Sequence, residues 1–213
     1  VNGHFMCDEG RLSYKKENEN RFLTMQCNQE TETLNNAKAS VIKTLKEEKN
    51  ILIVVSPMLS CEELKAAQQL AVKTHASISG YAPYYFDESF KDELLRTHDK
   101  APNRKAYETI NISEDERQFN ANLAQASLVI ILENSYFEDK PTLLNGKKVI
   151  HLTSHNSAIN SFANIAIGIS SFLEKNGTYI NCDGIQQEVI SKINKDTRAV
   201  DLKEFLDTIN SML

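Results

Sequence analysis

The sequence lacks the features on which several classes of protein depend. Its longest apolar runs are ILIVV at 51–55 and LVIIL at 128–132, whereas a membrane-spanning helix needs about 20 apolar residues. Basic residues are not in excess either, because 24 lysines and arginines are interspersed with 29 aspartates and glutamates, for a net charge of -5. We therefore expect no direct membrane insertion and no nucleic-acid partner, since a nucleic-acid-binding surface needs clustered positive charge.

The N-terminal residues lack the succession of basic, apolar and small residues that marks a secretory signal. The chain has only four cysteines, and they lie far apart: Cys7, Cys27, Cys61 and Cys182. Disulfide scaffolds are typical of smaller secreted domains with denser cysteines. These features together indicate a cytoplasmic protein without a disulfide framework.

Glycine is also scarce where a phosphate-binding loop would need it. The seven glycines are scattered, and the apolar run ILIVV is followed by SPMLSCEE, which contains none. Neither a dinucleotide-binding fingerprint nor a P-loop is present, because both depend on clustered glycines. The sequence therefore assigns no cofactor-binding residue.

Three groups of reactive side chains favour a structural interpretation. Cys61 falls in the first turn of a predicted helix, where a thiolate is stabilised, but the adjacent Glu62 and Glu63 oppose its formation and no base is identifiable. His151 and His155 are four residues apart, a metal-ligand spacing on a helix, yet they fall at a predicted strand end without an acidic or thiol partner nearby in sequence. The segment THDKAPNRK (97–105) is interpreted as a surface turn, because its Pro-Asn pair forms turns. No catalytic residue is assigned.

The strongest positive signal is an alternation of apolar strands and amphipathic helices. Strands are predicted at 51–56, 77–81, 126–133, 147–153 and 164–170, and helices at 31–49, 60–74, 114–125 and 200–213. Ser60 and Glu63 form a capping box at the start of the second helix. Strands that are apolar throughout are covered on both faces. The pattern predicts an α/β fold: an open, mostly parallel, Rossmann-like sheet with helices on both faces.

The domain organisation follows from where this pattern begins and ends. Residues 31–172 are predicted to form the α/β domain. Residues 1–30 are polar and form an irregular N-terminal segment, and residues 173–213 form a small C-terminal extension with a closing helix.

The first 15 residues, VNGHFMCDEGRLSYK, resemble the end of the iron-sulfur module in the molybdopterin oxidoreductase superfamily. The similarity is closest to the large iron-sulfur (G-type) subunit of NADH:quinone oxidoreductase, respiratory complex I. Cys7, Gly10 and Arg11 match the motif that closes a four-cysteine [4Fe-4S] site in that family.

Further segments are similar to the same family and occur in the same order: ILIVVSPMLSCEE (51–63), DKAPNRKAYETINI (99–112), LVIILE (128–133) and NIAIGISSFLEKNGTYINCDGIQQ (164–187). The chain also departs from the family. Lys105 and Ala106 stand where a glycine is usual, and Asp183 replaces a glutamate.

The resemblance implies a structural role without chemistry of its own. Residues 1–30 would be the remnant of an iron-sulfur module, and Cys7 would be the fourth [4Fe-4S] ligand only in a full-length subunit whose other three cysteines precede Val1. This chain would hold no cofactor. No molybdopterin is expected, because no serine, cysteine or selenocysteine is placed as a molybdenum ligand. The partners would be other subunits of the peripheral arm of complex I, which would place the chain beside the inner membrane.

Two alternatives remain open at this point. The chain could be a fragment of a pterin-binding formate-dehydrogenase-like or hydrogenase-associated subunit, in which case molybdenum or tungsten would be bound. It could also be a free-standing α/β module that binds a small nucleotide despite lacking glycine loops.

Overall fold

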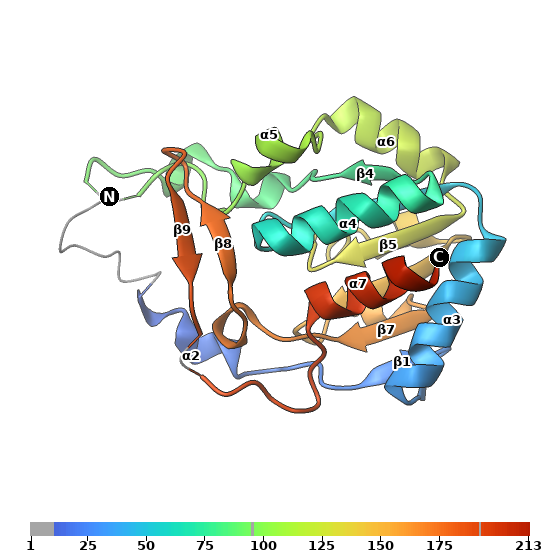
Figure 1. Ribbon diagram of the computed structural model, residues 1–213. Coiled ribbons are helices and arrows are strands. Elements are labelled where there is room, and N and C mark those ends of the chain that lie inside the picture. The colour runs from blue at the N-terminus through green and yellow to red at the C-terminus, as the bar shows by residue number, and fades with distance from the viewer. Residues whose placement is uncertain (1–10, 95, 192) are drawn as a thin grey trace.

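A computed structural model describes residues 11–94, 96–191 and 193–213, and its centre is a seven-stranded sheet. The strand order is β2-β1-β7-β6-β5-β3-β4 (Figure 1). Five strands run parallel to one another: β3 (Ile51–Val55), β4 (Ser77–Ser79), β5 (Leu128–Leu132), β6 (Lys148–Thr153) and β7 (Ile165–Gly168). The predicted α/β fold with an open, mostly parallel sheet is confirmed.

Helices cover both faces of this sheet, as the apolar strands required. One face packs against α3 (Leu34–Glu47), α4 (Cys61–Thr74) and α7 (Leu202–Met212), with the short α5 (Ala106–Ile110) beside α4. The other face is covered by α6 (Glu116–Gln125) and by the 3-10 turns η3 (Pro141–Leu144) and η4 (Ala158–Ser161). Every residue of β3 and β5 is buried between the two layers.

The predicted capping box is present at the start of α4. The Ser60 hydroxyl accepts a hydrogen bond from the Glu63 amide at 3.2 Å, and the Glu63 carboxylate accepts one from the Ser60 amide at 2.7 Å. This box fixes the direction in which α4 leaves the end of β3. The Glu63 carboxylate is consequently held at the carboxyl edge of the sheet.

Two strands of the sheet were not predicted from the sequence. β1 (Met25–Cys27) pairs antiparallel with β7, and β2 (Glu30–Thr31) continues the sheet beyond it. Both strands are short, lie near the sheet edge and are not fully buried. They therefore lack the apolar run by which the other strands were predicted. Gly168 permits the close approach of this segment, since a Cβ there would lie 2.3 Å from the Phe22 carbonyl oxygen.

The remaining elements gather at the carboxyl ends of the parallel strands. Figure 1 shows β5 and β7 pointing toward the side that carries α2 (Tyr14–Glu17) and the two-stranded hairpin of β8 (Gly177–Ile180) and β9 (Gln186–Val189). The connecting turns η1 (Pro83–Tyr85), η2 (Glu88–Phe90) and η5 (Phe172–Glu174) complete the element list. The segment between β4 and α6 is mostly loop and contains the short elements η1, η2 and α5.

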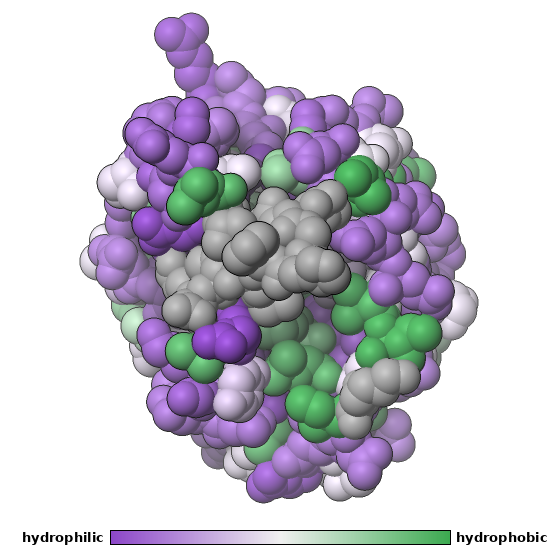
Figure 2. Space-filling view, turned by 90° about the vertical axis from the view of Figure 1, so that its left-hand side faces the viewer, coloured by the Kyte–Doolittle hydropathy of each residue, from purple (hydrophilic) through white to green (hydrophobic). Residues whose placement is uncertain are grey.

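The surface on this side is mixed in polarity. Figure 2 views it directly and shows hydrophobic patches among hydrophilic residues. Four of the exposed aliphatic side chains belong to the hairpin and its exit: Ile185, Val189, Ile190 and Ile193. Among the described residues, no helix has both the length and the apolar character needed to cross a membrane.

Candidate functional site

Ligands of open parallel α/β sheets bind in the crevice beyond the carboxyl ends of the strands. In this structure two features occupy that edge. One is a buried polar cluster at the start of α4, and the other is a cavity around Glu133.

The first feature, the α4 N-terminal cluster, consists of Ser60, Cys61, Glu63, Asn103 and Lys175. Asn103 is fully buried. Its Nδ2 donates to the Leu59 carbonyl at 2.7 Å, and its Oδ1 accepts from the Ile180 amide at 2.7 Å. One amide side chain therefore joins the β3–α4 loop to strand β8. The surface turn predicted for residues 97–105 is wrong at Asn103, because β8 covers this turn and the amide groups find their partners inside.

An ion pair between Glu63 and Lys175 completes the cluster. The Lys175 Nζ lies 2.9 Å from both carboxylate oxygens of Glu63, and the two side chains are only 7% and 5% exposed. Burial alone would lower the pKa of Lys175, but Glu63, together with Tyr179 and Glu133, outweighs burial and the pKa is raised. Lys175 is therefore charged and fixed, and Glu63 serves both as a helix cap and as its counterion.

The rest of the EKNGT turn (174–178) is bound in the same manner. The Glu174 carboxylate pairs with Arg21 at 2.7 Å, with both side chains 8% exposed. A Cβ on Gly177 would lie 2.5 Å from the Cβ of Ser60, so a side chain there would push β8 away from α4. The Thr178 amide donates to Glu62 at 2.9 Å. Each of these contacts ties the turn to a segment more than 100 residues earlier in the chain.

Cys61, which the sequence predicts to be a structural thiol, belongs to this cluster. It is buried, and its Sγ lies 3.6 Å from the Asn103 Oδ1. Burial raises the pKa of this thiol, with the charge of Glu62 contributing in the same direction. A thiol that is protonated and covered is a poor nucleophile.

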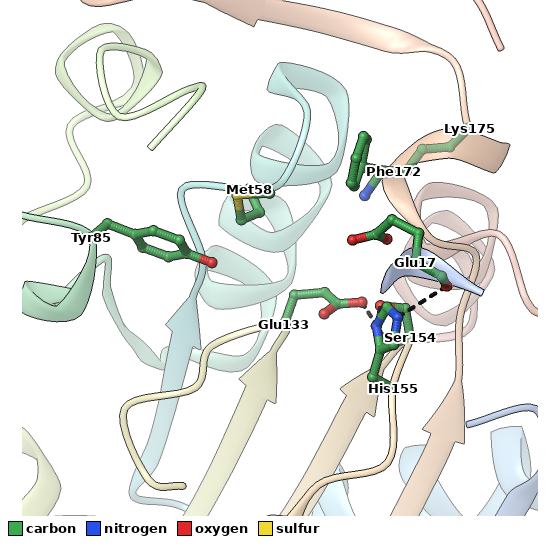
Figure 3. Close-up of a pocket in the computed structure, with 8 residues that line it drawn as sticks. All are labelled: Glu17, Met58, Tyr85, Glu133, Ser154, His155, Phe172 and Lys175. Carbon is green, nitrogen blue, oxygen red and sulfur yellow. Dashed lines mark hydrogen bonds between the residues drawn. The ribbon is translucent and has the colours of Figure 1, made fainter. Parts of the chain in front are cut away.

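The second feature, the Glu133 cavity, lies beyond the ends of β3, β5 and β6. It has a volume of about 160 Å³, and its lining comprises Glu17, Met58, Tyr85, Glu133, Ser154, His155, Phe172 and Lys175. Figure 3 shows the carboxylates of Glu17 and Glu133 and the hydroxyl of Tyr85 directed toward the same space. A second cavity of about 160 Å³ adjoins it and shares Tyr85, Glu133 and His155.

Glu133 is held in an unusual backbone conformation at the end of β5. Its φ of 53° lies in the left-handed region, which disfavours residues other than glycine by about 1–2 kcal/mol. The conformation persists because the Glu133 amide donates to the Leu152 carbonyl and its carboxylate accepts from the Ser154 amide at 2.7 Å. Burial raises the pKa of the Glu133 carboxyl, and it also raises the pKa of Glu17.

The two histidines of HLTSH occupy different environments. His155 follows β6, and its Nε2 contacts the Glu17 carbonyl at 3.1 Å, which fastens α2 to the sheet edge. His151 lies inside β6, is 2% exposed and contacts Asn160 through Nδ1 at 2.6 Å. Burial lowers the pKa of His151 to about 4. The sequence placed both residues at the strand end, which is confirmed for His155 but wrong for His151.

The predicted iron-sulfur ligand, Cys7, lies outside the described residues. Cys27 is half-buried in β1 and Cys182 is exposed in the β8–β9 turn. Within residues 11–94, 96–191 and 193–213, no group of three or more His, Cys, Asp or Glu side chains could hold a metal ion. The described cysteines therefore do not fit an iron-sulfur cluster.

Sequence reasoning missed the residues that line the Glu133 cavity. Glu133 could have been found, because it is the first polar residue after a buried parallel strand and such positions meet at the ligand-binding edge. Glu17, Tyr85 and Lys175 come from distant segments and carry no local signal.

Comparison with known proteins adds no relative. No protein-family model matches the chain, and no curated protein matches its sequence.

Breaking the buried ion pair should strongly destabilise the fold. We expect Lys175→Met to lower the free energy of unfolding by about 3–5 kcal/mol, because Glu63 is left buried without a counterion. The double variant Glu63→Gln/Lys175→Met should recover part of that loss, since neither charge of the pair remains and glutamine keeps the cap. Urea denaturation at pH 7 measures both. The exposed lysine of the Lys203–Asp207 pair supplies the control, because Lys203→Met should change stability by less than about 1 kcal/mol. If Lys175→Met and Lys203→Met changed the free energy of unfolding equally, the Glu63–Lys175 pair would not be a stabilising buried ion pair.

Acid should destabilise the fold through His151. The pKa of His151 is about 4 in the folded chain, against a usual value of 6.5, so the unfolded chain takes up this proton first as pH falls. The contribution is therefore lost between pH 6.5 and 4, and from pH 7 to pH 5 it amounts to about 2 kcal/mol. We expect His151→Gln to lose about 2 kcal/mol less than the wild type over this interval in urea titrations. His75→Asn, at the exposed end of α4, should behave like the wild type, and an unchanged pH dependence in His151→Gln would disprove the effect.

Proposed function

We propose that this chain is a degenerate molybdopterin-oxidoreductase-like domain of a G-type subunit of NADH:quinone oxidoreductase. Its role is structural. It supports the electron-carrying iron-sulfur part of the subunit and contacts neighbouring subunits of the peripheral arm, while the parent complex transfers electrons. In the full-length subunit, Cys7 serves as the fourth ligand of a [4Fe-4S] cluster, and the domain itself holds no pterin.

One observation carries this proposal: three of the five segments that resemble the family meet at one place in the fold. SPMLSCEE supplies Ser60, Cys61 and Glu63, the Pro-Asn segment supplies Asn103, and the EKNGT turn supplies Lys175. Segments that resemble a family only by chance would have no reason to bind one another. Their convergence supports a shared structural unit.

The contacts also support a scaffold rather than a catalyst. At the α4 N-terminal cluster, the buried side chains of Glu63 and Lys175 form an ion pair with each other, and the thiol of Cys61 is buried. Charged groups that are already paired within the fold are not available to bind a substrate or to transfer a proton to it. The exposed aliphatic side chains of the hairpin give the proposed neighbouring subunits a surface to contact.

The nucleotide-binding alternative is less well supported by the electrostatics. Phosphates bind where backbone amides and positive charge converge. Here Glu17 and Glu133 present carboxylates at the carboxyl edge of the sheet, while Lys175 is engaged by Glu63 and Arg21 by Glu174. This arrangement repels an anion.

The proposal is tested on the native protein from cells that produce it. With an affinity tag on its C-terminus, the protein should co-purify with identified subunits of NADH:quinone oxidoreductase, and the preparation should carry the electron paramagnetic resonance signal of reduced [4Fe-4S] clusters. Cys7→Ala should weaken one cluster signal, whereas Cys182→Ala, which removes an exposed cysteine, should leave the spectrum unchanged.

Two results would contradict the proposal. One is purification of the tagged protein without any subunit of that complex. The other is molybdenum or tungsten at about one atom per chain, which would favour the pterin-binding alternative.

A further inference from the structure

The structural role does not explain the charged groups that line the Glu133 cavity. The positive groups nearest to it are already paired, Lys175 with Glu63 and Arg21 with Glu174. The Glu17 carboxylate, by contrast, has no hydrogen bond or ion pair within the part of the chain that the structure describes. The Glu133 carboxylate has the Ser154 amide as its one described hydrogen-bond donor. The cavity therefore faces two carboxyl groups that have spare acceptor capacity.

The adjoining cavity adds an acceptor of a different kind. His151 lines it and is 2% exposed. Its Nδ1 lies 2.6 Å from the Asn160 Oδ1, which makes Nδ1 the protonated nitrogen because a carbonyl oxygen only accepts. Its Nε2 is then an acceptor, and no residue among those described donates to it. Because His151 lines the adjoining cavity, this nitrogen offers an acceptor to a ligand that brings an N–H donor.

The size and walls of the cavities suit a small organic molecule. Each has about 160 Å³, and an engineered cavity of about 150 Å³ holds benzene, which has six non-hydrogen atoms. Met58, Tyr85 and Phe172 give the first cavity apolar and aromatic surface. Aromatic faces favour cations, and methylene groups pack against them.

We propose that the Glu133 cavity binds a small organic cation with N–H donors, whose charged group lies between the carboxylates of Glu17 and Glu133. A chain of a few methylene groups lies along Tyr85 and extends toward the acceptor nitrogen of His151. A diamine has the charge, the donors and the length for this path. The site is independent of the proposed scaffold role, because its residues lie within this chain and need no neighbouring subunit.

Isothermal titration calorimetry on the purified chain tests the site with 1,4-diaminobutane as the probe. We expect saturable binding at pH 7.5, and binding at least tenfold weaker for butane-1,4-diol, which has the same length and no charge. Glu17→Gln and Glu133→Gln should each weaken diamine binding at least tenfold, because each removes one carboxylate charge. Glu17 lies on the short helix α2, which has no buried residues. The Glu17→Gln variant should therefore fold and can test the site even if Glu133→Gln does not fold.

Glu19→Gln is the matched control, because it removes an exposed carboxylate two residues from Glu17 and should leave the affinity unchanged. No saturable binding, equal affinity for the diol, or an equal loss in Glu19→Gln would overturn the proposal. The last result would mean that the diamine responds to the negative charge of the whole chain.

Discussion

The attachment of the β8–β9 hairpin to the α/β domain depends on the side-chain amide of Asn103. This amide donates to the loop that opens α4 through a buried contact and accepts from the backbone of β8 through a partly buried one, and both contacts are 2.7 Å long. A buried backbone group that loses its hydrogen-bond partner costs about 1–3 kcal/mol of stability. Removing the Asn103 amide would therefore leave the Leu59 carbonyl and the Ile180 amide without this partner. The buried ion pair of Glu63 and Lys175 lies in the same cluster. The hairpin is therefore also held by two opposite charges, and both must be present. Together they turn a peripheral two-stranded hairpin into part of the α/β domain.

The carboxyl edge of the sheet follows from this docking. Phe172 of η5 and Lys175 of the EKNGT turn line the Glu133 cavity, and the Arg21–Glu174 pair holds the N-terminal segment against the same edge. The crevice in which open α/β folds bind ligands is therefore narrowed to the Glu133 cavity and its neighbour. What remains open there is small and is lined by the carboxylates of Glu17 and Glu133.

The fold was largely predictable from the sequence because its signals are local. ILIVV and LVIIL are apolar throughout, and the capping box of Ser60 and Glu63 marks the start of a helix within four residues. β1 was missed because pairing with β7, rather than its own composition, makes it a strand. Asn103 was misread for a related reason: a Pro-Asn turn has the same local chemistry whether or not a distant strand covers it.

The candidate site was less predictable because it is assembled from long-range contacts. Glu63 and Lys175 are 112 positions apart in the chain, and the contact of His155 with the Glu17 carbonyl spans 138 positions. No periodicity or short motif encodes such pairs. Only the resemblance placed SPMLSCEE, the Pro-Asn segment and EKNGT in one set, and it did so by order along the chain rather than by contact.

Hydrogen exchange at the β8–β9 hairpin tests most directly whether Asn103 holds this region together. In Asn103→Ala, the amides of β8, beginning with that of Ile180, should exchange about tenfold to hundredfold faster than in the wild type, since about 1.4 kcal/mol corresponds to a factor of ten. The amides of β3 and β5 should be far less affected, and Asn120→Ala, on the exposed side of α6, should change neither region. Unchanged exchange in β8 would show that the hairpin is held by other contacts and would contradict the account.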